Sequence, residues 1–142
     1  MVDRAKLDSM LSNLKAYVEV LRRLAAVPRE VFLADPDKLG NAKYHFVIAI
    51  ECCIDIGNHV VASERLRIPH DNADVFVVLA ENGFCSAALE PSLRAMARFR
   101  KRLVHLYWKV DDELVYTYLQ ESLADFDRFA IAVGTESNGS QK

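Results

Sequence analysis

Apolar residues recur three and four positions apart along most of the chain, which is the spacing of one face of an α-helix. A first helix is predicted over residues 3–26, with Asp3 able to cap it and Pro28 to end it. A second helix, over residues 42–66, is apolar around much of its circumference. It should therefore lie at the centre of the fold.

The segment between these two helices gives a mixed signal. Asp35-Pro36 has the form of a helix cap followed by a first helical residue, whereas Gly40 can interrupt a helix. We expect a loop with a short turn over residues 29–41.

Three more helices follow in the pattern. The first of them is capped by Asp71 or Asn72 and ended by Gly83. Its valines also suit a buried strand, but no partner strand is in sight, and a helix is the better interpretation. The first of the three is expected over residues 72–80 and the last over residues 111–133. The helix between them is expected to begin between Ser86 and Pro91.

The predicted fold class is therefore all-α, an antiparallel bundle of four to five helices. No linker or internal repeat divides the chain, so we expect a single domain over residues 1–133. The polar segment at residues 134–142 is expected to be a disordered tail.

Composition limits the function classes. The net charge of −2 means that any nucleic-acid binding must come from a local patch. The three cysteines, of which Cys52 and Cys53 are adjacent, form neither a disulfide framework nor a paired metal motif, and indicate a reducing compartment. No apolar run reaches membrane length and no signal-peptide core is visible, so we expect a cytoplasmic protein with no membrane contact.

Candidate chemistry lies within residues 93–111, LRAMARFRKRLVHLYWKVD. Arg100 falls in the apolar stripe of the fourth helix, where a guanidinium must be paired, hydrated or placed at a subunit boundary. His105 follows in the last turn, on a second stripe that is basic and could bind an anion such as RNA. The other cations on or beside that stripe are Arg94, Arg98, Lys101 and Arg102.

A polar line crosses the apolar second helix. Glu51, Asp55 and His59 are each four residues apart, and Asn58 is adjacent. These groups could satisfy one another, pair with Arg100, or ligate a metal. One helix supplies only three ligands and no second Glu-x-x-His occurs, so polar support for Arg100 is favoured and no metal or other cofactor is expected.

Arg100 and His105 are separated by about 140° on a continuous helix. They share a face only if the helix loosens near its end, or they meet across a dimer axis. One histidine and one arginine form an incomplete ribonuclease, because attack of a ribose 2′-hydroxyl needs a base, an acid and a cation on the phosphorane. A two-fold axis would complete the set without metal. The alternative, favoured on these residues alone, is a solvated basic face with a histidine near the helix C-terminus.

Arg100, His105 and Tyr107 also form the R-x4-H-x-Y pattern of the HEPN superfamily. The surrounding RFRKRLVHLYWKVD, with Trp108 and Asp111, closely resembles the HepT toxins. The second-helix segment IECCIDIGNHVVA is similar to the corresponding family segment, with polar positions at Glu51, Asp55, Asn58 and His59.

This resemblance implies a HEPN-like bundle that acts as a homodimer, the toxin of a type II toxin-antitoxin system. It implies metal-independent RNA cleavage in a cleft between subunits lined by Arg100 and His105. The implied partner is a minimal nucleotidyltransferase antitoxin that transfers AMP from ATP to Tyr107, so that added phosphates fill the anion site and repel RNA. Lys101 departs from the family, which often has asparagine there. A non-catalytic RNA- or partner-binding bundle is the alternative.

Overall fold

The part of the chain described by the computed structural model consists of seven α-helices and one 3₁₀ helix, so the all-α prediction is confirmed. The backbone is described for residues 2–140 and the side chains for residues 2–134. The elements are α1 (Arg4–Ala25), α2 (Arg29–Leu33), α3 (Pro36–Ser63), α4 (Asn72–Glu81), α5 (Glu90–His105), η1 (Tyr107–Lys109), α6 (Asp112–Glu121) and α7 (Leu123–Ser140).

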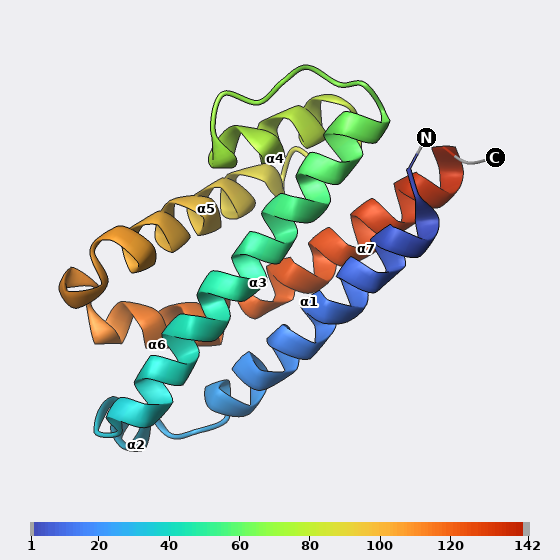
Figure 1. Cartoon of the computed structure of the whole chain (residues 1–142). Coiled ribbons are helices and arrows are strands. Elements are labelled where there is room, and N and C mark those ends of the chain that lie inside the picture. Colours follow the sequence, from blue (N-terminus) through green and yellow to red (C-terminus); the bar gives the residue numbers. More distant parts are fainter. Residues whose placement is uncertain (1, 141–142) are drawn as a thin grey trace.

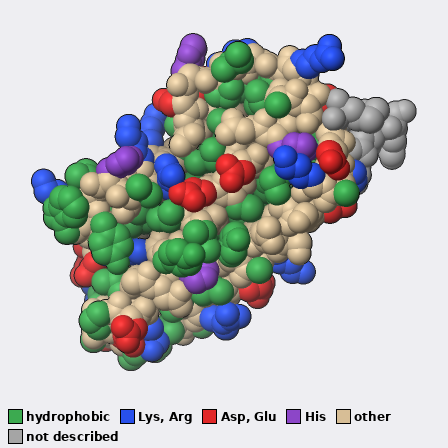
Figure 2. All heavy atoms as spheres, in the orientation of Figure 1, with side chains coloured by type: hydrophobic (Ala, Val, Ile, Leu, Met, Phe, Trp, Pro, Cys, Tyr) green, Lys and Arg blue, Asp and Glu red, His purple; other side chains and the backbone are tan. Residues whose placement is uncertain are grey.

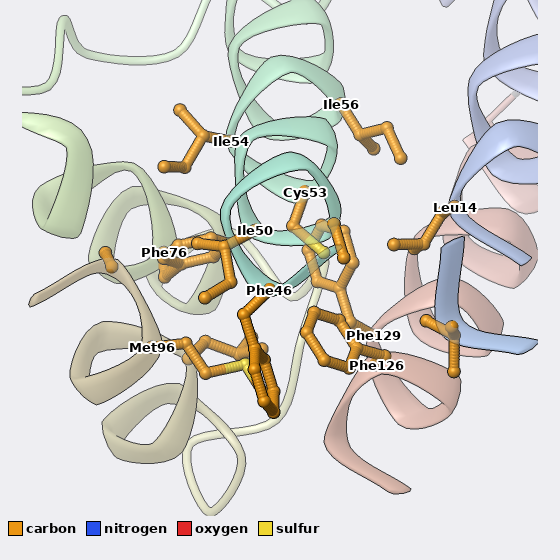
Figure 3. Packing of buried hydrophobic residues seen from close by; sticks show 14 of the residues in the cluster. Leu14, Phe46, Ile50, Cys53, Ile54, Ile56, Phe76, Met96, Phe126 and Phe129 are labelled. Carbon is orange, nitrogen blue, oxygen red and sulfur yellow. The ribbon is translucent and has the colours of Figure 1, made fainter. Parts of the chain in front are cut away.

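Helix α3 is the central element of the bundle. It packs against α1 on one side and against α4 and α5 on the other, while α7 runs beside α1 (Figure 1). Aromatic rings fill the space between the helices: Phe46 meets Phe99 edge-on at 5.5 Å, and Phe99 stacks on Tyr118 at 4.2 Å. Further buried side chains from α1, α3, α4, α5 and α7 complete this core (Figure 3).

Aspartate caps begin four of the helices. The carboxylates of Asp3, Asp35, Asp71 and Asp111 each accept a backbone N–H from the first turn of α1, α3, α4 and α6. At Gly83, φ is +79°, which allows the chain to leave α4 as predicted. The starts of α1 and α4 therefore agree with the sequence pattern.

Two segments were predicted wrongly. Residues 29–41 are not a loop, because α2 forms there and α3 begins at Pro36, passing through Gly40 without interruption. The expected fifth helix is broken at Ser122 into α6 and α7. The break lets α6 pack on α2 and α3 while α7 follows α1, and this raises the helix number above the expected four to five. The tail expected over residues 134–142 overlaps the end of α7, which continues to Ser140, and residues 141–142 lie outside the described part of the chain.

By length and composition, α3 is long and apolar enough to cross a membrane, so the prediction that no segment reaches that length is wrong for this helix. Its packing partners explain the composition. Helices α1, α2, α4, α5 and α6 all contact α3, and a core helix buried on several sides needs apolar residues around most of its circumference.

Close approach of α4 to α3 depends on Gly57. A Cβ atom at this position would lie 2.4 Å from Val75 Cγ1 and 3.2 Å from Leu79 Cδ1. Valine is branched at Cβ and has little rotamer freedom to move aside. The glycine therefore sets the distance between the two helices.

We predict that Gly57→Ala lowers the free energy of unfolding by about 1–3 kcal/mol, because overpacking outweighs the gain in helix propensity. Gly40→Ala is the matched control in the same helix, since its Cβ would meet only Tyr107 Oη at 3.8 Å. It should raise the free energy of unfolding by roughly 0.5–1 kcal/mol. Urea unfolding of both variants measures the difference, and equal stability of the two would contradict the proposed close packing.

Candidate active site

Arg100 projects from α5 toward α3, where Glu51 meets it. Its Nη2 and Nε atoms lie 2.6 Å and 3.2 Å from Glu51 Oε1 and both donate to that oxygen. The arginine side chain is only 21% exposed, so this pairing supplies the counter-charge that a guanidinium in a packing stripe needs. Of the alternatives that the sequence left open for Arg100, the structure shows the ion pair.

A pocket of about 330 Å³, called here the cationic pocket, lies beside this pair. Both Arg100 and His105 line it, although a continuous helix separates such positions widely. Helix α5 ends at His105, and Leu106 leaves the helical conformation with φ −133° and ψ 40°. The lining residues are Asp71, Asn72, Ala73, Ala97, Arg98, Arg100, Lys101 and His105.

A second hollow of about 280 Å³, called here the polar pocket, adjoins the first. The two share Arg100 and Asn72, so they form one continuous depression between α3, α4 and α5. In Figure 2, Lys, Arg and His side chains gather along the α5 side of this face, with acidic side chains beside them over α3. The polar pocket is lined by Glu51, Ile54, Asp55, Asn58, Asn72 and Arg100.

The start of α4 closes the depression, and an ion-pair network fixes it. Arg67 donates to both carboxylate oxygens of Asp74, at 2.7 Å and 3.0 Å, and also to Glu81. Hydrogen bonds from Arg67 and from the His70 backbone lower the pKa of Asp74 to about 2. The connection between α3 and α4 is thereby held to the first turn of α4, which presents Asn72 to the pocket.

Other predicted site residues lie apart from the cationic pocket. Arg94 pairs with Glu90 at 2.7 Å, and Arg102 is exposed and does not line the pocket. Asp111 caps α6 by accepting the N–H of Glu113 at 2.9 Å, which is a structural contact.

The metal alternative required Glu51, Asp55 and His59 to converge. His59 lines a further hollow together with Asp55, Asn58, Lys6 and Met10, but Glu51 does not line it and is paired with Arg100. Among the described residues, no group of three or more His, Cys, Asp or Glu side chains is placed to hold a metal ion.

Tyr107 lies in η1, just beyond the cationic pocket. Its ring is half exposed, and the Lys43 ammonium sits 4.4 Å from the ring centroid. Lys43 itself is buried and lies 3.4 Å from Asp112 Oδ1. The Lys43 ammonium thus holds one face of the ring against α3, and the ring's hydroxyl lies near Gly40, 3.8 Å from where a Cβ atom there would lie.

The cysteines offer no nucleophile. Burial raises the pKa of the Cys52 and Cys85 thiols to about 11, and that of Cys53 well above its usual value. All three are free thiols, and at neutral pH they stay protonated.

Sequence reasoning assigned Asn72 only a possible capping role and did not consider Lys43. Both reach the site through tertiary packing, Asn72 from α4 and Lys43 from α3. No local sequence signal marks either residue, because the residues that they face lie far along the chain.

The geometry defines a class of protein: a small helical bundle with a surface depression that is lined by three cationic side chains and one histidine. A family model described as Ribonuclease HepT-like matches residues 14–133, and the chain belongs to this family. The resemblance stated from R-x4-H-x-Y is confirmed.

Similar proteins agree with this assignment. The mRNA nuclease HepT of Shewanella oneidensis is 34% identical over 86 residues, which cover 61% of this chain and 65% of that protein, just under two thirds of its length. The tri-AMPylated HEPN toxin of Shewanella oneidensis in complex with an MNT antitoxin has a TM-score of 0.85, at 24% identity over 95% of this chain and 99% of that one. YutE, a cytosolic Bacillus subtilis protein of unknown function, has a TM-score of 0.84, at 18% identity over 98% and 93%. The two structures share the fold.

Proposed function

We propose that this chain is the toxin of a type II toxin-antitoxin system and cleaves RNA without a metal ion. The observation that carries the proposal is the joint placement of Arg100 and His105 in one cationic pocket with Arg98 and Lys101. Membership of the HepT-like family supports it. We also propose a cytoplasmic location, which suits three free thiols.

The chemistry follows from the side chains. Arg98, Arg100 and Lys101 neutralise the scissile phosphate, and Arg100 has a further nitrogen, Nη1, beyond the two that bind Glu51. The imidazole of His105 takes the proton from the ribose 2′-hydroxyl, whose oxygen attacks phosphorus. The 5′-oxygen leaves and receives a proton from a second imidazole. The products are a 2′,3′-cyclic phosphate and a 5′-hydroxyl end.

RNA cleavage in the presence of EDTA tests this proposal. Arg100→Ala and His105→Ala should each lower the cleavage rate by at least about a hundredfold, because each removes a group that acts in the transition state. Arg23→Ala, on an exposed position of α1, is the matched control for loss of one positive charge. Salt-sensitive RNA binding with no cleavage product from the wild type would instead favour the non-catalytic alternative.

The second imidazole must come from another copy of the chain, and we propose a homodimer. The end of α5 and the following turn expose apolar side chains next to His105: Val104, Leu106 and Trp108, with Trp108 76% exposed. Exposed apolar residues in such a group mark an interaction surface. A second copy placed on this surface brings its own His105 close to the first.

Trp108 is the chain's only tryptophan, so its fluorescence reports on this surface. We predict a dimer in sedimentation experiments, and a shift of the emission maximum to longer wavelength on dilution, as the indole becomes hydrated. Trp108→Ser should weaken the dimer and lower RNA cleavage together. Ile131→Ser, at an exposed position of α7, is the control and should change neither. A wild-type monomer at all concentrations would contradict the dimer.

We further propose that a minimal nucleotidyltransferase antitoxin modifies Tyr107. The tyrosine oxygen attacks the α-phosphorus of ATP, pyrophosphate leaves, and the phenolic proton is lost to solvent. The half exposure of Tyr107 in η1 supports access of this kind. Phosphates added next to the cationic pocket repel RNA.

Intact-mass measurement after co-expression with a neighbouring nucleotidyltransferase tests the modification. We expect mass increments of whole adenylate units that map to Tyr107 and a parallel loss of RNA cleavage. Tyr107→Phe should remove the increments, whereas Tyr44→Phe, at a more exposed tyrosine on α3, should keep them. Unmodified wild-type protein after active co-expression would refute this part of the proposal.

A further inference from the structure

The polar pocket differs in chemistry from the cationic pocket that it adjoins. Its wall from α3 carries Glu51, Asp55 and Asn58, its wall from α4 carries Asn72, and Ile54 is buried at its base. Apart from Arg100, no residue in its lining is cationic. A phosphate group bound at Arg100 would therefore not extend into this hollow, because the carboxylates repel it.

Three of these side chains are unused by the fold. Asp55, Asn58 and Asn72 make no side-chain hydrogen bond or ion pair with any described residue, whereas Glu51 is held by Arg100. Each of the three is exposed to solvent. The hollow thus presents one free carboxylate and two free amides within reach of a ligand held at Arg100.

In RNA, each phosphate is joined to two nucleosides, whose sugars and bases carry no charge. A nucleoside is therefore the part of RNA that could enter the polar pocket when a phosphate is bound at Arg100. Proteins that read single-stranded RNA do so through hydrogen bonds to the base edges. A carboxylate offers two acceptor oxygens side by side and no donor. Guanine presents two adjacent donors, N1–H and N2–H, on its pairing edge. In the other three bases an acceptor, either a ring nitrogen or a carbonyl oxygen, lies beside the single donor group. This acceptor would face the second carboxylate oxygen, and two acceptors repel each other.

We propose that the polar pocket is a base-recognition subsite that selects guanine in one of the two nucleotides joined by the scissile phosphate. Asp55 accepts from N1–H and N2–H, the amides of Asn58 and Asn72 donate to the carbonyl oxygen O6 and the ring nitrogen N7, and Ile54 supports the apolar face of the base. The subsite rests on the proposed ribonuclease function, because Arg100 holds the phosphate that places the base.

Sequencing of cleavage ends from a randomised single-stranded RNA tests the subsite. Guanine should be enriched at one position next to the cut. In Asp55→Asn, which is isosteric but turns one acceptor into a donor, the ratio of guanine to uracil cleavage should fall roughly tenfold. Glu19→Gln removes a similar charge from an exposed position of α1 and should leave the ratio unchanged.

A binding measurement that needs no catalysis accompanies this experiment. Guanosine 3′-monophosphate should bind the wild-type protein more tightly than cytidine 3′-monophosphate in a calorimetric titration, and Asp55→Asn should remove the difference. Selective binding without any RNA cleavage would support the subsite and overturn the ribonuclease proposal. Cleavage with no base preference at the cut, or a preference that Asp55→Asn leaves intact, would overturn the subsite and keep the ribonuclease.

Discussion

The ion pair between Arg100 and Glu51 is the interaction on which the site depends. Arg100 occupies a position in the inward stripe of α5 where its neighbours are apolar, and its burial there requires an opposite charge. Glu51 supplies it from α3, 49 residues earlier in the chain. Because the pair is partly hydrated, its contribution to stability is modest. The larger effect of the ion pair is to fix the position of the guanidinium, between the cationic pocket on the α5 side and the polar pocket on the α3 side.

The second constraint is the packing of α4. Gly57 allows this helix to approach α3 closely, and Arg67 ties the preceding connection to Asp74 and Glu81. Together these contacts position the first turn of α4 so that Asn72 lines both pockets with Arg100. A protein with net charge −2 can still offer a local cationic surface, because Arg98, Arg100 and Lys101 line the cationic pocket against a single carboxylate, Asp71.

Local interactions explain what could be predicted from the sequence. Capping by Asp71 and the end of α4 at Gly83 depend on residues within three or four positions, and both were predictable. The α6–α7 break at Ser122 was not, because it follows from packing of α6 on α2, far away in the chain. The pairing of Arg94 with Glu90, four residues earlier, is of the same local kind as the Asp71 cap, since its spacing is visible in the sequence. Nothing in the sequence marked Asn72 as a site residue, since only the fold brings it into the pockets that Arg100 lines.

The arrangement also explains how one tyrosine could control the proposed reaction. Tyr107 follows His105 by two residues and precedes the exposed Trp108, so it lies between the cationic pocket and the apolar surface proposed for the dimer. Lys43 beneath its ring is already paired with Asp112, and it cannot neutralise several added phosphates. Under the proposed mechanism, adenylate groups at this position therefore act twice. They place negative charge where the RNA phosphate must bind, and they place bulk where the second histidine must approach.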